Sequence, residues 1–119
     1  MGEETTFNDL DVLLSHYRNA VQHSTKWGPT LFSPLFSEMK AIIEDRNKHM
    51  IYHCLLILTD GCIHDLRKTV NHIVDCTVHP LSIIIVGIGD ADFSAMETLD
   101  SDEYSLVDGF GIEAKRDIC

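Results

Sequence analysis

Two short apolar runs, separated by a segment with helical periodicity, constrain the fold of this chain more than any other feature. Residues 52–59 read YHCLLILT, and residues 81–89 read LSIIIVGIG. The apolar stretch of the first run is too short for a helix, and the second run is rich in β-branched side chains, so we predict two strands. A continuous apolar run is typical of a strand that is covered on both faces. We therefore expect two buried strands.

The segment between the runs is predicted to be a helix over residues 65–77. Its inward positions are Leu66, Val70, Ile73 and Val74, and His79-Pro80 ends it. Two buried strands joined by a helical crossover form a βαβ unit, which implies a parallel sheet with helices on its faces. Parallel sheets place ligand sites at the carboxyl ends of their strands. In this chain those ends are Asp60-Gly61 and residues 87–90.

Three further helices are predicted from apolar spacing and capping residues. One runs from Asn8 to about His23, with Asn8 or Asp9 able to cap its start. A second covers residues 33–46, after a turn at residues 27–30. A short one covers residues 93–99, with Asp92 as its cap. Residues 100–111 are predicted to be loop with at most one short edge strand.

The charge balance excludes one class of partner and leaves another open. The chain carries 19 acidic and 9 basic residues, for a formal net charge of −10. Phosphate backbones repel such a surface, so we expect no nucleic acid partner. The acidity is compatible either with divalent cations or with an ordinary soluble surface. Because the amino terminus does not resemble a signal peptide and no apolar run could span a membrane, we expect a cytoplasmic location.

The cysteine pattern indicates free thiols. Cys54, Cys62, Cys76 and Cys119 form no Cys-x-x-Cys pair and no zinc-ligand spacing. Cys54 lies in an apolar run and Cys76 at the apolar edge of a predicted helix, so we expect both to be buried thiols in a reducing compartment.

Catalytic signatures are absent from the sequence. It contains no Gly-x-Ser-x-Gly, no catalytic-cysteine signature and no Walker loop. Residues 86–90 read VGIGD, but the third glycine and the long following helix of dinucleotide folds are missing. We therefore expect that the chain is not an enzyme. A nucleotide- or substrate-binding enzyme is the less favoured alternative.

Several segments together resemble one known family. They are the turn at residues 28–30 and the strand and turn at residues 55–61, followed by residues 81–89, 91–96, 99–102 and 115–118. In this order and spacing they resemble the A domain of copines, most strongly over residues 27–117. The resemblance implies an α/β fold: a partial von Willebrand A (Rossmann-like) parallel sheet with flanking helices that lacks the first strands. Residues 1–119 would form one partial domain, with residues 1–7 disordered.

The resemblance also implies a cation site. A domains hold a divalent cation at a metal-ion-dependent adhesion site, using an Asp-x-Ser-x-Ser loop, a threonine and an aspartate. Thr30 matches the threonine and Asp60 matches the aspartate. Oxygen ligands of this kind suit Mg²⁺, Mn²⁺ or Ca²⁺. Because the sequence has no Asp-x-Ser-x-Ser, we expect an incomplete site.

The function implied by the resemblance is protein interaction. The resemblance implies membership of a family of calcium-dependent phospholipid-binding proteins. Proteins of this family act in membrane-associated signalling and are recruited to the plasma membrane through C2 domains. These residues match no C2 domain, so we expect protein partners and no direct lipid contact. A truncated or degenerate family member with only a structural role is the alternative. The strand at residues 52–59 would lack a neighbour, and its free edge predicts self-association.

Overall fold

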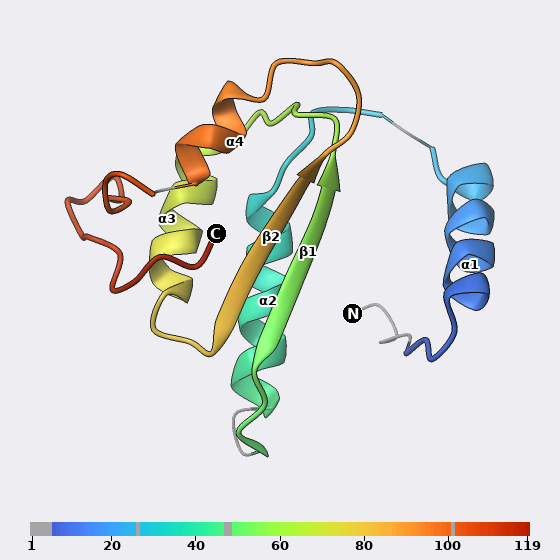
Figure 1. Ribbon diagram of the computed structural model, residues 1–119, viewed down its shortest axis with the longest axis horizontal. Coiled ribbons are helices and arrows are strands. Elements are labelled where there is room, and N and C mark those ends of the chain that lie inside the picture. The colour runs from blue at the N-terminus through green and yellow to red at the C-terminus, as the bar shows by residue number, and fades with distance from the viewer. Residues whose placement is uncertain (1–5, 26, 47–48, 101) are drawn as a thin grey trace.

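The computed structural model describes residues 6–25, 27–46, 49–100 and 102–119. The elements along the chain are α1 (Leu10–His23), α2 (Ser33–Arg46), β1 (His53–Thr59), α3 (Leu66–Cys76), β2 (Leu81–Gly87) and α4 (Ser94–Leu99) (Figure 1). The predicted α/β class is confirmed. β1 and β2 pair in parallel, with His53 opposite Leu81 and Thr59 opposite Gly87, and α3 makes the crossover between them.

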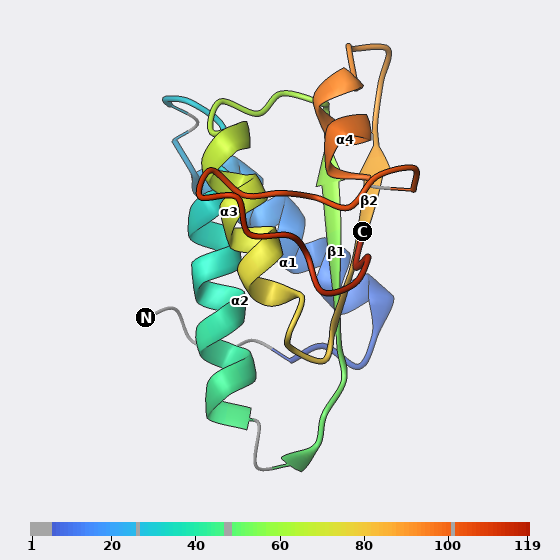
Figure 2. The same ribbon diagram turned by 90° about the vertical axis from the view of Figure 1, so that its left-hand side faces the viewer.

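One face of this two-stranded sheet is covered. Figure 2 shows α2 and α3 together on one side of the strands, and these two helices also contact each other. The core between the layers is made by side chains from the helices, the strands and α4, among them Phe36, Ile43, Ile73, Leu81, Ile83 and Leu99. Burying one such side chain stabilises a fold by about 1.5–3 kcal/mol, so each of these residues contributes to stability through the covered face.

The opposite face of the sheet is open, which corrects the prediction that the strands are covered on both faces. The exposed fractions of Leu56, Leu58, Ile84 and Val86 are 56%, 61%, 50% and 41%. Successive side chains of a strand point to opposite faces, and these four share the face away from α2 and α3. Cys54 lies on the same face and is exposed, so the prediction of a buried thiol is wrong there, whereas Cys76 is buried as predicted.

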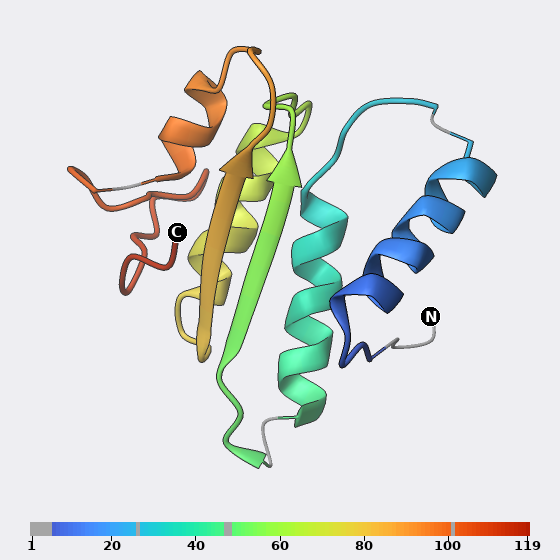
Figure 3. The ribbon, with the colours of Figure 1, turned by 45° about the vertical axis from the view of Figure 1, so that its right-hand side comes forward.

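The first helix stands apart from the sheet (Figure 3). Asp9 caps it, because its carboxylate Oδ1 accepts a hydrogen bond from the backbone N–H of Asp11 at 2.7 Å. The helix contains no buried residue, and its apolar stripe is exposed, with Leu10 at 68% and Tyr17 at 66%. The predicted disorder of residues 1–7 falls mostly on residues 1–5, which lie outside the described residues.

The chain after α4 is irregular and returns to the outer edge of β2. Its strand-like pairing among the described residues is one isolated bridge between Val107 and Glu113, within the single short edge strand predicted. The carbonyl of Ile118 accepts a hydrogen bond from the Ile83 backbone N–H. The Arg116 guanidinium donates to the carbonyls of His79 and Leu81, at 2.7 and 2.6 Å. These contacts fasten the last residues beside β2.

Candidate functional site

The ring of Phe93 packs against the turns at the carboxyl ends of both strands. A Cβ atom added at Gly87 would lie 2.6 Å from a ring carbon, and one added at Gly61 would lie 2.9 Å from another. Gly61 also has φ +93°, a conformation that side chains disfavour. The Ile88 backbone N–H donates to the Thr59 carbonyl at 2.8 Å. The glycines at both strand ends therefore allow one aromatic ring to pack on both turns.

The loop that carries Thr30 is fastened to the loop that follows β1. The Thr30 backbone N–H donates to His64 Nδ1 at 3.0 Å, and the His64 backbone N–H donates to the Thr30 carbonyl at 2.9 Å. A ring nitrogen that accepts a hydrogen bond carries no proton, so the proton of the neutral ring is on Nε2. His64 therefore fixes the position of Thr30 next to the loop that contains Asp60.

Asp65, just before α3, adds two hydrogen bonds to the start of α2. Its two carboxylate oxygens accept hydrogen bonds from the backbone N–H groups of Phe32 and Ser33, each at 2.9 Å, which caps the start of α2. Burial raises the pKa of Asp65, but the hydrogen bonds from Ser33, Phe32 and Thr69 outweigh it and hold the pKa below its ordinary value of 3.8. The sequence did not reveal this role, because Asp65 precedes α3 and caps a helix more than thirty residues earlier.

The two predicted cation ligands lie on these fastened loops, and both are exposed. Asp60 Oδ1 accepts the Cys62 backbone N–H at 3.1 Å, in a local turn. Thr30 and Asp60 supply one hydroxyl and one carboxylate, which leaves most of an octahedral Mg²⁺ shell to water. The residues of this chain alone therefore fit such a cation poorly, and the assignment of Thr30 and Asp60 to a metal stays a prediction.

A second acidic group lies after α4 and was not predicted from the sequence. Asp100, Asp102 and Asp117 each place a carboxylate oxygen within 4.8 Å of the other two, and all three are exposed. The approach of Asp117 depends on how the last residues return to β2, so spacing along the chain could not indicate it. Carboxylate oxygens suit hard cations, yet exposed acidic groups also gather without one.

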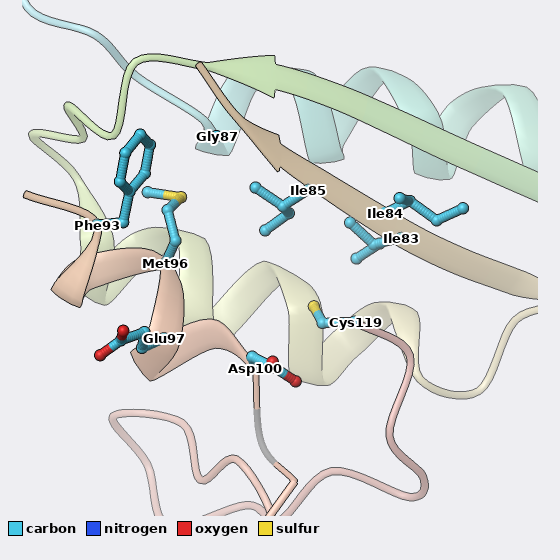
Figure 4. Close-up of a pocket in the computed structure, with 9 residues that line it drawn as sticks. All are labelled: Ile83, Ile84, Ile85, Gly87, Phe93, Met96, Glu97, Asp100 and Cys119. Carbon is cyan, nitrogen blue, oxygen red and sulfur yellow. The ribbon is translucent and has the colours of Figure 1, made fainter. Parts of the chain in front are cut away.

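A groove of about 530 Å³ follows the outer edge of β2, between this strand, α4 and the last residue (Figure 4). Its apolar side is made by Ile83, Ile85, Phe93 and Met96, with Glu97 and Asp100 along the other side. Burial, with the nearby charges of Asp117 and Asp100, raises the pKa of the Cys119 thiol to about 12. This thiol stays protonated near neutral pH and is unsuited to act as a nucleophile there.

Comparisons with known proteins identify the family of these residues. The copine family profile matches residues 2–119. Protein BONZAI 2 of Arabidopsis thaliana is 40% identical over 99% of this chain and 21% of its own length. Copine-D of Dictyostelium discoideum is 35% identical over 92% of this chain and 21% of its own length. Nicotinic receptor-associated protein 1 of Caenorhabditis briggsae is 40% identical over 89% of this chain and 17% of its own length.

The chain thus spans about a fifth of the length of these curated relatives. Within the part of the chain that the structure describes, no helix has the length and apolar character needed to cross a membrane. None of the three names denotes an enzyme.

Proposed function

The chain belongs to the copine family, and from that membership we propose that it is a non-catalytic A-domain module that recruits protein partners. The recruiting surface in this proposal is the carboxyl edge of the sheet, formed by the Thr30 loop and the loop after β1. The observation that supports it most directly is the pair of hydrogen bonds between Thr30 and His64, which fixes two exposed loops in one position. A preorganised edge binds a partner with a smaller loss of conformational entropy.

The proposal includes a divalent cation, for which this chain supplies only part of the ligands. Thr30 and Asp60 contribute two oxygens to a Mg²⁺, Mn²⁺ or Ca²⁺ ion, and a partner or another segment supplies the rest. These residues alone then bind the ion weakly. The calcium-dependent phospholipid binding implied by the family is assigned to C2 domains, so recruitment of this module from the cytoplasm to the plasma membrane would be indirect.

The test uses a matched pair of charge changes on the full chain. Asp60→Ala alters the proposed edge, whereas Asp45→Ala alters an exposed residue in the last turn of α2. The carboxyl end of α2 lies near the start of β1, at the opposite end of the sheet (Figure 1). We expect affinity capture from a cytosolic extract to yield partners whose recovery falls with Asp60→Ala and not with Asp45→Ala. A set of partners that responds equally to the two substitutions would contradict the proposed surface.

Calorimetric titration tests the cation separately. With Mg²⁺ or Mn²⁺ we expect millimolar or weaker binding by the chain. Submillimolar binding that disappears in Asp60→Ala would show that the site needs no further ligands.

The open sheet face supports a second proposal, self-association. Four exposed aliphatic side chains cover this face, and two of them, Leu56 and Leu58, come from β1, whose outer edge pairs with no other strand among the described residues. Unpaired edges and exposed apolar patches favour association. Light scattering at increasing concentration should show a mass above that of the monomer, and a constant monomer mass would contradict this proposal.

A further inference from the structure

The chain exposes two separate apolar surfaces. One is the open sheet face described above. The other is a stripe along α1, with exposed fractions between 39% and 68%, made by Leu10, Leu13, Leu14 and Tyr17. These four positions follow the i, i+3, i+4, i+7 spacing of one helix face, which is the pattern of a helix that packs on another element. Contiguous exposed apolar surfaces of this kind mark interaction sites.

The two surfaces match in size. The 14 residues of α1 give a helix roughly 21 Å long, and the seven residues of each strand extend over roughly 23 Å. A helix is roughly 10 Å wide, and the strands of a pair lie roughly 4.8 Å apart, so one helix covers both strands. The α1 stripe can therefore lie along the whole open face.

The area of the contact indicates how two copies would use these surfaces. One α1 on one open face covers roughly 20 Å by 10 Å, which removes roughly 400 Å² from water when both surfaces are counted. Two open faces packed on each other would make one contact of that size and would leave both α1 stripes exposed. A reciprocal exchange makes the contact twice, and roughly 800 Å² approaches the roughly 1,000 Å² of a specific interface. Exchange therefore covers more apolar surface than sheet-to-sheet packing.

Charge favours one direction of the helix on the sheet. Asp9 and Asp11 lie at the start of α1, and Arg18 lies in its second half. The exposed carboxylates of Asp60 and Asp90 follow the carboxyl ends of β1 and β2. A helix parallel to the strands brings Arg18 toward these carboxylates, whereas the opposite direction would bring Asp9 and Asp11 beside them.

Within one chain, α1 does not cover the open face. Figure 1 shows this helix beside the sheet, beyond the outer edge of β1. The two hydrogen bonds between Thr30 and His64 attach the segment after α1 to the carboxyl edge of the sheet. The helix thus projects from a fixed point to the side of the sheet, where a second copy can reach it.

We propose that two copies of this chain exchange their first helices. The α1 stripe of each copy packs on the open sheet face of the other, parallel to its strands, in a closed two-fold dimer. This inference rests on the self-association proposed above and identifies the surface that the sheet face binds. Because the buried area is small, we expect a weak dimer with a dissociation constant in the micromolar range or above.

The first experiment compares two lysine substitutions in α1 of the full chain. Tyr17→Lys places a charge in the stripe, whereas Asn19→Lys places it on the opposite side of the helix, two residues further along. In sedimentation or light scattering across a concentration series, we expect Tyr17→Lys to raise the dissociation constant about tenfold or more. Asn19→Lys should change it less than about twofold. Both residues are exposed, so both melting curves should stay unaltered.

The outcomes separate this inference from the proposal on which it rests. If Leu58→Lys weakens the dimer and Tyr17→Lys does not, the open face binds another surface and the exchange of α1 is wrong. If the unaltered chain stays monomeric at every concentration, self-association itself is contradicted, and the exchange with it.

Cross-linking tests the partner and the direction of the helix. Cys54 is exposed near the start of β1, so a parallel α1 from the second copy places Leu10 close to it and Val21 far from it. A short bismaleimide should join the new thiol of Leu10→Cys to Cys54, and Cys54→Ser should abolish this product. Val21→Cys should give no product with Cys54.

Isotope labelling shows whether the cross-link joins two copies. In a mixture of ¹⁵N-labelled and unlabelled Leu10→Cys chains, mass spectrometry should find cross-linked peptide pairs with one labelled member. Pairs of uniform labelling alone would mean that α1 covers its own sheet, which would overturn the exchange. A product from Val21→Cys in place of Leu10→Cys would overturn the parallel direction.

Discussion

The two faces of the sheet differ in how far their side chains are buried, and two adjacent residues of β2 show this difference. Ile83 and Ile84 are chemically identical and follow one another in β2, yet 3% of Ile83 is exposed and 50% of Ile84. The side chain of Ile83 points into the core formed with α2, α3 and Ile118, and that of Ile84 points to the open face. Residue type therefore does not decide burial here. The decisive factor is whether another element packs on that side of the strand.

The largest change in the free energy of unfolding is expected from a substitution on the covered face. Ile83→Ala removes a buried side chain and should lower the free energy of unfolding by about 2–5 kcal/mol, whereas Ile84→Ala should cost less than about 1 kcal/mol. Urea unfolding of the two variants measures the difference. Equal losses would mean that the open face is also packed in solution, as it would be in a tight dimer.

A smaller loss is expected at the carboxyl end of the covered face. In Gly87→Ala the new methyl group would meet the Phe93 ring, and such overpacking typically costs about 1–3 kcal/mol. Gly109→Ala is the control, because its Cβ would have an ordinary contact at 3.6 Å. Adding Phe93→Ala to Gly87→Ala should cost less than the sum of the two single changes. Additive losses in thermal or urea melts would show that the ring and the glycine are independent.

The stability that Asp65 contributes by capping α2 should depend on pH. Asp65→Asn weakens the cap of α2 and should cost about 1 kcal/mol at neutral pH. The folded pKa of Asp65 lies below 3.8, so the stability that its carboxylate contributes is present above that value and is lost as the pH falls through the folded pKa. The difference between the unaltered chain and Asp65→Asn should therefore shrink below pH 3.8. A difference that is constant from pH 7 to pH 3 would contradict the role of the charge, and Asp45→Asn on the exposed side of α2 serves as the control.

The smallest effect on stability is expected on the open face. Leu58→Lys places a charge where the side chain is already 61% exposed, so the free energy of unfolding should change by less than about 0.5 kcal/mol. Self-association should fall, because charges on an exposed sheet oppose pairing. Light scattering across a concentration series measures it. A large loss of stability together with a loss of association would show that folding depends on the second copy.

Much of the fold could be predicted because its signals are local. The predicted α2 coincides with Ser33–Arg46, and the strands and α3 differ from the prediction by one or two residues at their ends. The apolar run of β1 was correctly predicted to be a strand, but the coverage of its second face was not. An apolar run predicts a strand that favours an apolar environment. It does not predict which element of the protein, or which partner, covers each face.

The site could be predicted only in part. Thr30 and Asp60 were found by resemblance, and the structure places their loops against each other through His64. The contacts of His64 and Asp65 join residues more than thirty positions apart, so neither residue stands out in a local pattern.

The ring of Phe93 packs against the turns that end β1 and β2, and α4 begins at the next residue. A side chain at Gly61 or Gly87 would have to displace this ring, so the two turns and the start of α4 form one packed unit. A partner that binds at this edge would therefore meet these three segments together. A partner that moves one of the turns would also have to rearrange the aromatic side chain and the helix that begins beside it.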